Sequence, residues 1–170
     1  MIFSCPWDTK VSLITGAYVL VLLIVIVILS IRLVGYLKEK RILPIVLFSI
    51  GVLFFAGILI VSAMDCPCKI SLENETLTIH RVQKNIVIPI ENIEKIRLCN
   101  DTDTRDSKRT AGSGGAFGYL GKFRNAQLGN YLMYVTNRSQ RILLKTDAKL
   151  FVFSCEQPEV LVNLVQQNIP

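Results

Sequence analysis

A glycine-rich stretch, GSGGAFGYLGKFRN at residues 112–125, has the composition most like that of a phosphate-binding loop. A Walker A loop has the pattern G-x-x-x-x-G-K-[ST], because its lysine reaches the phosphates and its hydroxyl binds magnesium. Here the spacing from Gly115 to Gly121 is one residue too long, and Phe123 replaces the hydroxyl. The dinucleotide pattern G-x-G-x-x-G also fails, because Phe117 stands at its third glycine. The stretch therefore predicts no nucleotide site and no cofactor.

Three cysteines flank the two longest apolar runs of the chain. Cys5 precedes the first run, and Cys66 and Cys68 follow the second. If both ends of this hairpin face an oxidising compartment, Cys5 can form a disulfide with Cys66 or Cys68. Reduced thiols without a role are the alternative. A zinc site needs four Cys or His ligands, and His80 is the only histidine, so we predict no metal site.

Residues for acid–base or nucleophilic catalysis do not occur in a recognisable arrangement. His80 ends an apolar strand pattern, LTIHRV, with no catalytic motif around it. Asp101, Asp103 and Asp106 in NDTDTRD lack the glycine and the final glutamate of an EF-hand calcium loop. The sequence therefore predicts a non-catalytic protein.

Four cations in or beside the glycine-rich stretch are candidates to face an anionic ligand or anionic lipid head groups. They are Lys108, Arg109, Lys122 and Arg124. The other charges are scattered, and residues 66–170 carry 14 Lys or Arg against 10 Asp or Glu. This balance is too mild to indicate a nucleic-acid partner.

Two uncharged apolar runs determine where these cysteines and cations lie relative to a membrane. The chain has 170 residues, and residues 11–31 and 42–64 contain no charged side chain. A bilayer core of about 30 Å needs about 20 helical residues, so each run is long enough to span it. We predict membrane spans near residues 12–36 and 42–64, which form a transmembrane hairpin domain over residues 1–65.

The connector between the two runs contains Arg32, Lys38, Lys40 and Arg41 against Glu39 alone. Such an excess of Lys and Arg usually keeps a short loop in the cytoplasm. We therefore predict a multi-pass membrane protein whose two chain ends, and with them the polar domain, lie outside the cytoplasm.

The second predicted domain covers residues 66–170, where apolar residues alternate with a period of two. Short alternating runs separated by turn residues indicate antiparallel strands. They occur in KISLENETLTIHRV, NIVIPI, ENIEKIRLC, YLMYVTN, RILLKT and KLFVFS, whereas EQPEVLVNLVQQN has helical spacing. The polar segment NDTDTRDSKRTAGSG is interpreted as a mobile loop. We predict an α+β fold in which about seven strands form a barrel or sandwich closed by one C-terminal helix.

Gly115, Gly118 and Gly121 recur at every third residue where one of these strands begins. Glycine in a strand typically marks a bulge, a tight corner or the close approach of another backbone. We therefore interpret these glycines as structural residues that bend the strand. The aromatic residues between them alternate, so we expect one shared face for Phe117, Tyr119 and Phe123.

Short motifs in this part of the chain resemble the bacterial pleckstrin-homology (PH) domain family. They are Arg109, GSGGAFGYLGKF at residues 112–123, Leu128-Gly129, YVT at residues 134–136 and a helix start near Pro158. The resemblance covers roughly residues 66–170. It implies a strongly bent, mostly antiparallel, seven-stranded barrel capped by the C-terminal helix and often attached to membrane spans. It also implies a location in the bacterial inner membrane, and it adds Gly129 to the structural glycines.

Two classes of function remain open. In the first, the protein is a membrane-anchored, non-catalytic module for protein interaction or self-assembly, and its partner is a membrane protein or a second copy. In the second, it is a sensor of anionic lipid or of a small ligand at the membrane surface, where the four cations meet the head groups. The sequence favours the first class. Salt-dependent binding of the domain to anionic vesicles distinguishes the two.

Overall fold

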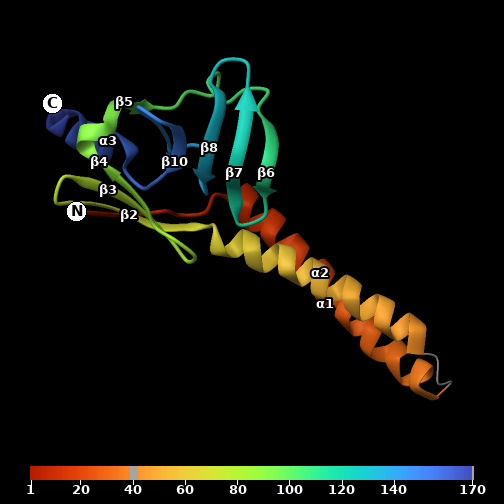
Figure 1. Cartoon of the computed structure of the whole chain (residues 1–170). Helices are drawn as coiled ribbons and strands as arrows, with labels where there is room; N and C mark the ends of the chain where they lie inside the picture. Colours follow the sequence, from red (N-terminus) through yellow and green to blue (C-terminus); the bar gives the residue numbers. More distant parts are fainter. Residues whose placement is uncertain (39–41, 170) are drawn as a thin grey trace.

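Two long helices project from one side of a sheet-rich domain (Figure 1). The computed structural model describes residues 1–38 and 42–169. Helix α1 covers Thr9–Lys38 and helix α2 covers Ile42–Met64. The stretches Thr9–Arg32 and Ile42–Met64 are long and apolar enough to cross a membrane. The connector residues Glu39, Lys40 and Arg41, on which much of the predicted orientation depends, lie outside the described residues.

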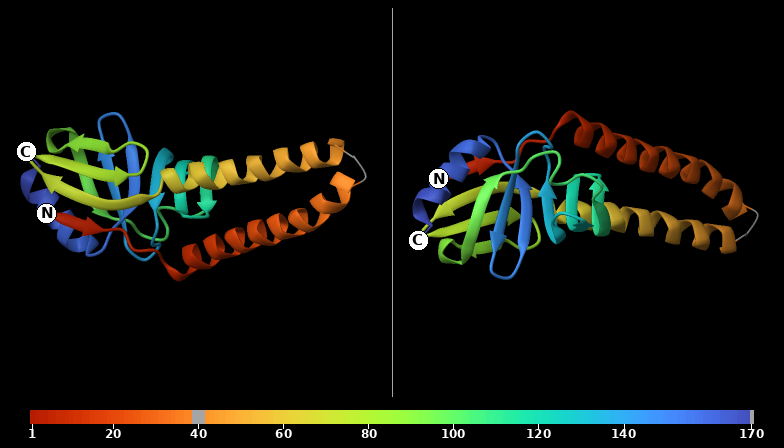
Figure 2. Two further views of the ribbon diagram at one scale, coloured as in Figure 1. Left: turned by 90° about the horizontal axis from the view of Figure 1, so that it is seen from below. Right: turned by 90° about the horizontal axis from the view of Figure 1, so that it is seen from above.

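Helix α1 begins at a capping residue that also contacts the domain. The Val11 backbone N–H donates to Asp8 Oδ1 at 2.7 Å, which satisfies one of the free donors of the first helical turn. The second oxygen of the same carboxylate accepts the Arg138 backbone N–H at 3.1 Å. Asp8 therefore starts the helix and joins it to the sheet. The two helices lie apart beside the domain and approach each other towards the connector (Figure 2).

A short strand precedes the helices. Strand β1 (Ile2–Ser4) pairs antiparallel with β2 (Pro67–Glu73), and Phe3 lies opposite Ile70. Phe3 is buried in the main core. The sequence places residues 1–65 in the hairpin domain and gives no sign of this strand, because three residues are too few to show a period. In the structure, the chain start belongs to the sheet of the polar domain.

The domain contains two sheets and a C-terminal helix. The four-stranded sheet has the order β1-β2-β3-β4, and the six-stranded sheet has the order β5-β9-β10-β8-β7-β6. The remaining elements are β3 (Thr76–Arg81), β4 (Ile86–Pro89), the 3-10 helix η1 (Ile90–Asn92), β5 (Ile93–Leu98), β6 (Lys108–Gly115), β7 (Gly118–Asn125), β8 (Gly129–Val135), β9 (Arg141–Thr146), β10 (Leu150–Ser154) and α3 (Pro158–Asn168). Paired strands are antiparallel, except β8 and β10, which are parallel. The predicted mostly antiparallel domain with a C-terminal helix is thus confirmed.

The predicted seven-stranded barrel is wrong in two respects. The two sheets do not close into a barrel within the described residues, and β2 to β10 make nine strands. Strand β6 occupies part of the segment interpreted as a mobile loop. Apart from Ala111, its side chains are polar or absent, so it has no apolar alternation. Its backbone nevertheless pairs with β7 from Lys108 to Gly115. A side-chain pattern cannot reveal a strand that is held by its backbone.

Apolar residues are buried on both faces of the six-stranded sheet. The main core lies on the face towards the four-stranded sheet and α3, and it includes the fully buried Leu144, Phe153 and Leu161. A second cluster on the other face includes Phe123, Tyr131, Met133, Leu143 and Val152. Alternation along β9 and β10 sends neighbouring side chains to opposite clusters.

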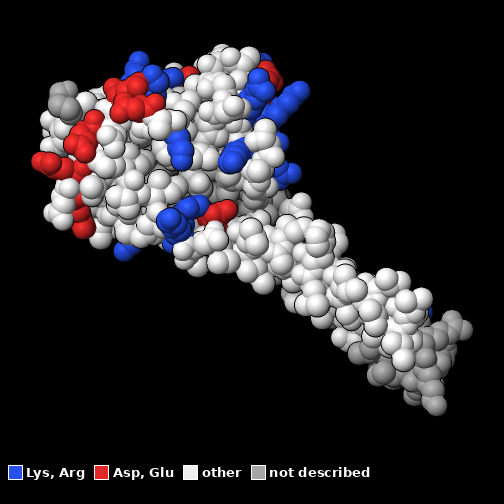
Figure 3. Space-filling view, in the orientation of Figure 1, with Lys and Arg blue, Asp and Glu red and all other residues white. Residues whose placement is uncertain are grey.

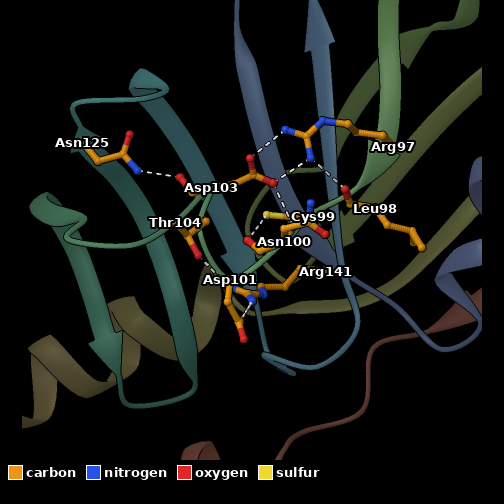
Figure 4. A network of polar contacts seen from close by, with 9 residues as sticks. All are labelled: Arg97, Leu98, Cys99, Asn100, Asp101, Asp103, Thr104, Asn125 and Arg141. Atoms are coloured by element: carbon orange, nitrogen blue, oxygen red, sulfur yellow. Dashed lines mark hydrogen bonds and ion pairs between the residues drawn. The ribbon is translucent and has the colours of Figure 1, made fainter.

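A polar network holds the loop between β5 and β6 against the second cluster (Figure 4). The Arg97 guanidinium donates two hydrogen bonds to the Asp103 carboxylate, at 2.6 and 2.8 Å. The buried Arg141 forms an ion pair with Asp101, and Asn125 Nδ2 donates to the Asp103 carbonyl at 2.6 Å. The loop that the sequence predicts to be mobile is therefore hydrogen-bonded to β5, β7 and β9.

Candidate functional site

The glycine-rich stretch forms a β-hairpin whose tip contacts helix α1. Strands β6 and β7 are joined by a two-residue turn, Ala116 and Phe117, and Gly115 pairs with Gly118 across it. The Phe117 backbone N–H donates to Thr15 Oγ1 at 2.8 Å. Thr15 is only 5% exposed although most side chains of the helix are exposed. The hairpin therefore joins the domain to the first helix rather than enclosing a phosphate.

Two of the predicted structural glycines lie where another backbone approaches closely. A Cβ atom at Gly118 would lie 2.7 Å from the Val135 carbonyl oxygen, and one at Gly121 would lie 2.4 Å from the Ala111 carbonyl oxygen. Both glycines have φ above +100°. Gly115 faces Ile14 on α1, and nothing lies within 4 Å of a Cβ at Gly129. The structural role of the four glycines stays a prediction, which denaturation experiments test.

Gly112 is a further crowded glycine, which the sequence interpretation did not single out. It pairs with Gly121 across the hairpin, and a Cβ atom there would lie 2.0 Å from the Leu120 carbonyl oxygen. Gly112 also lies three residues before Gly115, in line with the spacing of Gly115, Gly118 and Gly121. The signal that was present is the glycine content of the opposing strand, GSGG, which becomes meaningful once the two strands are known to pair.

The three aromatic residues of the hairpin do not share one face. Tyr119 and Phe123 pack with the second cluster, where the Phe123 ring stacks on Tyr131 with a centroid distance of 6.1 Å. Phe117 instead packs against the main core and meets the Trp7 ring edge-on at 5.8 Å. The expectation fails because Phe117 lies in the turn, where strand alternation has not yet begun.

A cavity of about 720 Å³ lies between α1, α2 and the edge strand β6. Its walls on the helices are almost entirely apolar, and its polar lining is concentrated where the helices meet the domain. The α1 lining extends from Ile14 to Val25, which corresponds to about 16 Å along a helix. The polar side chains at the domain end are Ser62, Arg109 and Ser113.

Only one of the four predicted anion-facing cations lines this cavity. The Arg109 side chain lies along the glycines of β6, and its Nη1 atom is 3.2 Å from the position of a Cβ at Gly114. Lys108 and Arg124 pair with each other at the opposite end of the hairpin from its tip. Lys122 lies between the two ends, and all four side chains are exposed. The structure thus separates Arg109 from the other three cations.

The charges of the domain are unevenly distributed. Lys and Arg gather over the β6 and β7 side, and Asp and Glu gather over the side of α3 and β4 (Figure 3). Among the described residues, no carboxylate forms an ion pair with Arg109, whereas Arg81, Arg97, Arg141 and Lys145 each have one. The cation at the cavity is therefore available to an anion from outside the chain.

The predicted disulfide cysteines lie at the same junction as free thiols. Cys5 and Cys66 are buried, and Cys68 is exposed. Burial raises the pKa of the Cys5 thiol to about 12 and that of the Cys66 thiol to about 11. The Cys66 thiol donates to the Phe117 carbonyl at 3.2 Å. Cys5 and Cys66 are thus protonated and weakly nucleophilic at neutral pH, and disulfide formation stays a prediction.

Groups for metal binding or catalysis do not converge at this junction. No cluster of three or more His, Cys, Asp or Glu side chains within residues 1–38 and 42–169 is arranged to hold a metal ion. The sequence interpretation missed one polar pair, in which Ser71 Oγ lies 2.8 Å from His80 Nε2. Within the described chain, no carboxylate forms a hydrogen bond with this histidine, and neither residue lines the cavity. The pair thus lacks the orienting acid of a catalytic triad.

Taken together, the sheets, the C-terminal helix and the paired apolar helices define a sheet-rich domain attached to a helical hairpin. A family model described as bacterial PH domain matches residues 68–169. Because this match covers more than half of the chain, the protein belongs to the bacterial PH domain family, and the resemblance seen in the sequence is confirmed. PH domains are generally non-catalytic. A comparison with curated proteins and one with solved structures found no match.

Proposed function

We propose that the protein is a membrane-anchored, non-catalytic module that binds a lipid from the surrounding bilayer where its helices meet its domain. The cavity between α1, α2 and β6 carries this proposal, because its apolar walls end in polar groups at the domain. Such a distribution suits a molecule with a long apolar part and a polar head. This observation favours the lipid-sensor class over the interaction module that the sequence favours.

The surfaces of the two helices support their insertion into a membrane. Large apolar side chains are exposed along both helices, and a lipid bilayer would remove this area from water. Charged residues flank the spans at the domain: Lys10 lies next to the first, and Asp65, which pairs with Arg81 at 2.6 Å, follows the second. These residues mark the level of the lipid head groups. The domain then lies directly on the membrane surface.

The length of the cavity supports a bilayer lipid as the ligand. Its α1 lining of about 16 Å matches one leaflet, since the whole hydrocarbon core is about 30 Å thick. A soluble metabolite would not need apolar walls of this length. The lipid would come from the leaflet next to the domain.

Occupancy of the cavity can be transmitted to the domain through β6. A lipid there touches both helices and the edge strand, whose tip is fixed to α1 by the Thr15 hydrogen bond. A change in helix separation therefore moves the hairpin relative to the sheet. Through this coupling, lipid binding between the helices would change the position of the β6–β7 hairpin in the domain.

Native mass spectrometry of the full-length protein, extracted in mild detergent, tests the proposal. Gly51 lines the cavity and Gly57 does not, yet neither has a heavy atom within 4 Å of an added Cβ. We expect wild type and Gly57→Leu to retain lipid, and Gly51→Leu to lose it because the new side chain fills the cavity. Equal lipid retention by Gly51→Leu and Gly57→Leu would contradict the proposal.

Self-assembly through a sheet edge is the second candidate function. Strand β4 ends its sheet, and Val87 on it is 59% exposed, with Val82 nearby at 66%. An open edge with exposed apolar side chains can pair with a strand of another chain. If this edge pairs, Val87→Lys lowers the yield of cross-linked dimer in membranes, whereas Lys84→Arg leaves it unchanged. An unchanged dimer yield in Val87→Lys would exclude β4 as the interface.

A further inference from the structure

We propose that the lipid in the cavity is an anionic phospholipid whose phosphate is bound by Arg109. This inference rests on the proposed function, because it names the head group of the lipid that the cavity holds. Among the residues that the structure describes, Arg109 is the only charged one that lines the cavity. Within the described residues it has no carboxylate partner, so its charge next to apolar walls is uncompensated.

Gly114 leaves room for this cation at the end of β6 near the helices. Gly114 has no side chain, and the Arg109 side chain lies beside it, with Nη1 3.2 Å from the position of a Cβ at Gly114. Gly114 is one residue from Gly115, which faces Ile14 in the first turns of α1. The Arg109 guanidinium therefore lies near the tip of the β6–β7 hairpin, which contacts α1.

A phosphate is the anion that this arrangement suits best. A guanidinium binds phosphate through two parallel hydrogen bonds, which gives both strength and orientation. Strand β6 is at the edge of its sheet, so alternate backbone N–H groups point away from β7 and supply further donors. Among the described residues, no residue of the other edge strands β1, β4 and β5 lines the cavity.

The depth of the guanidinium in the membrane fits a phospholipid rather than a free anion. Ile14 and Thr15, which the hairpin tip contacts, lie within the first turns after the uncharged run begins at Val11. This is the level at which head groups meet acyl chains. A phosphate on Arg109 thus places its acyl chain along the leaflet-long apolar wall.

Lipid competition in full-length protein tests the inference. Delipidated protein in detergent is mixed with equal amounts of phosphatidylglycerol and of diacylglycerol with the same acyl chains, which lacks the phosphate, and the bound lipids are counted by native mass spectrometry. We expect wild type to prefer phosphatidylglycerol by about tenfold, the size of a charge-assisted hydrogen bond. Arg109→Gln should bind both lipids equally. Arg124→Gln, which removes the same charge from the far end of the hairpin, should keep the wild-type preference.

Separate outcomes would overturn the inference and the proposed function. Lipid retained without preference, or an equal loss of preference in Arg109→Gln and Arg124→Gln, would refute the phosphate contact and leave lipid binding intact. No retained lipid in wild type would refute both. Glycerol 3-phosphate and oleate serve as further competitors. Displacement of phosphatidylglycerol by either one at equal concentration would show that a free phosphate or a carboxylate, not a phospholipid, is the ligand.

Discussion

Gly118 and Gly121 are two predicted structural glycines at which the structure leaves no room for a side chain. Each combines a φ above +100° with a carbonyl oxygen closer than 3.0 Å to the position of a Cβ. We expect Gly118→Ala and Gly121→Ala to lower the free energy of unfolding by about 1–3 kcal/mol each, because the backbone must leave a conformation that only glycine adopts freely.

Thermal denaturation of the full-length protein in detergent measures the effect of the two glycine substitutions. Gly57→Ala is the matched control, because a Cβ there meets no atom within 4 Å. Melting temperatures of Gly118→Ala and Gly121→Ala equal to that of Gly57→Ala would show that the hairpin tolerates side chains at both positions. The hairpin would then not be a close-packed structural element.

Asp103 makes the stability of the β5–β6 loop depend on pH. The hydrogen bonds from Arg97 hold the pKa of the Asp103 carboxyl below its ordinary value. A carboxyl whose pKa is lower in the folded state stabilises the protein above the pKa of the unfolded chain, about 3.9. This stabilisation is lost as the pH falls through the lower folded-state pKa.

Asp103→Asn therefore should be less stable than wild type at neutral pH, and the difference should shrink as the solution is acidified below about pH 4. Melting temperatures across this range give the comparison. Asp106→Asn is the control, because Asp106 lies in the same loop but forms no ion pair among the described residues. A constant difference between Asp103→Asn and wild type at all pH values would contradict the role of the Arg97 pair.

Strand β1 is the element whose contribution can be isolated most cleanly. Phe3 is 7% exposed and packs in the main core, whereas Ile2, its neighbour on the same strand, is 62% exposed. We expect Phe3→Ala to lower the free energy of unfolding by about 3–5 kcal/mol, as for other buried phenylalanines, and Ile2→Ala to change it little. Chemical denaturation of the full chain gives both values, and equal values would mean that β1 is not part of the cooperative core.

The elements that the sequence predicts are those whose side chains repeat with a structural period. The two apolar helices and the strands around Leu77, Leu144 and Phe153 alternate or persist clearly enough to be found. Strands β1 and β6 were missed for different reasons. The first is too short for a period, and the second is paired through a backbone that bears few apolar side chains. Strand β1 is held by β2, which is distant in sequence, and strand β6 is held by the backbone of β7.

The candidate site was predictable only in part for the same reason. The glycines and Arg109 are identifiable in the sequence, because glycine is unusual in a strand and Arg109 lies beside the glycine-rich stretch. Their role is not, because the cavity needs α1, α2 and β6 together. Lys108 and Arg124 look equivalent to Arg109 in the sequence. The structure distinguishes them, because the Arg109 side chain reaches the tip of the β6–β7 hairpin and the other two lie at its opposite end.

At the scale of the whole molecule, the most important prediction for the ligand is the orientation of helices α1 and α2 in the membrane, because it decides on which side of the membrane the domain lies. Glu39→Cys in a background with Cys68→Ser and Cys99→Ser, where the remaining cysteines are buried, places a reporter thiol in the connector. A membrane-impermeant maleimide should label it in inverted vesicles and not in intact cells, if the basic connector lies in the cytoplasm. Labelling in intact cells would place the domain in the cytoplasm and remove the oxidising surroundings that a Cys5 disulfide needs.

The pairing of β1 with β2 also fixes the order in which the molecule can be made. Residues 2–4 find their partner only after residues 67–73 have left the ribosome, and both apolar helices are synthesised in between. If the two helices cross a bilayer, β1 must reach the same side of the membrane as β2 before the core can close over Phe3. A chain inserted with these two strands on opposite sides would leave the four-stranded sheet without β1. Correct insertion would then be a condition for folding of the domain.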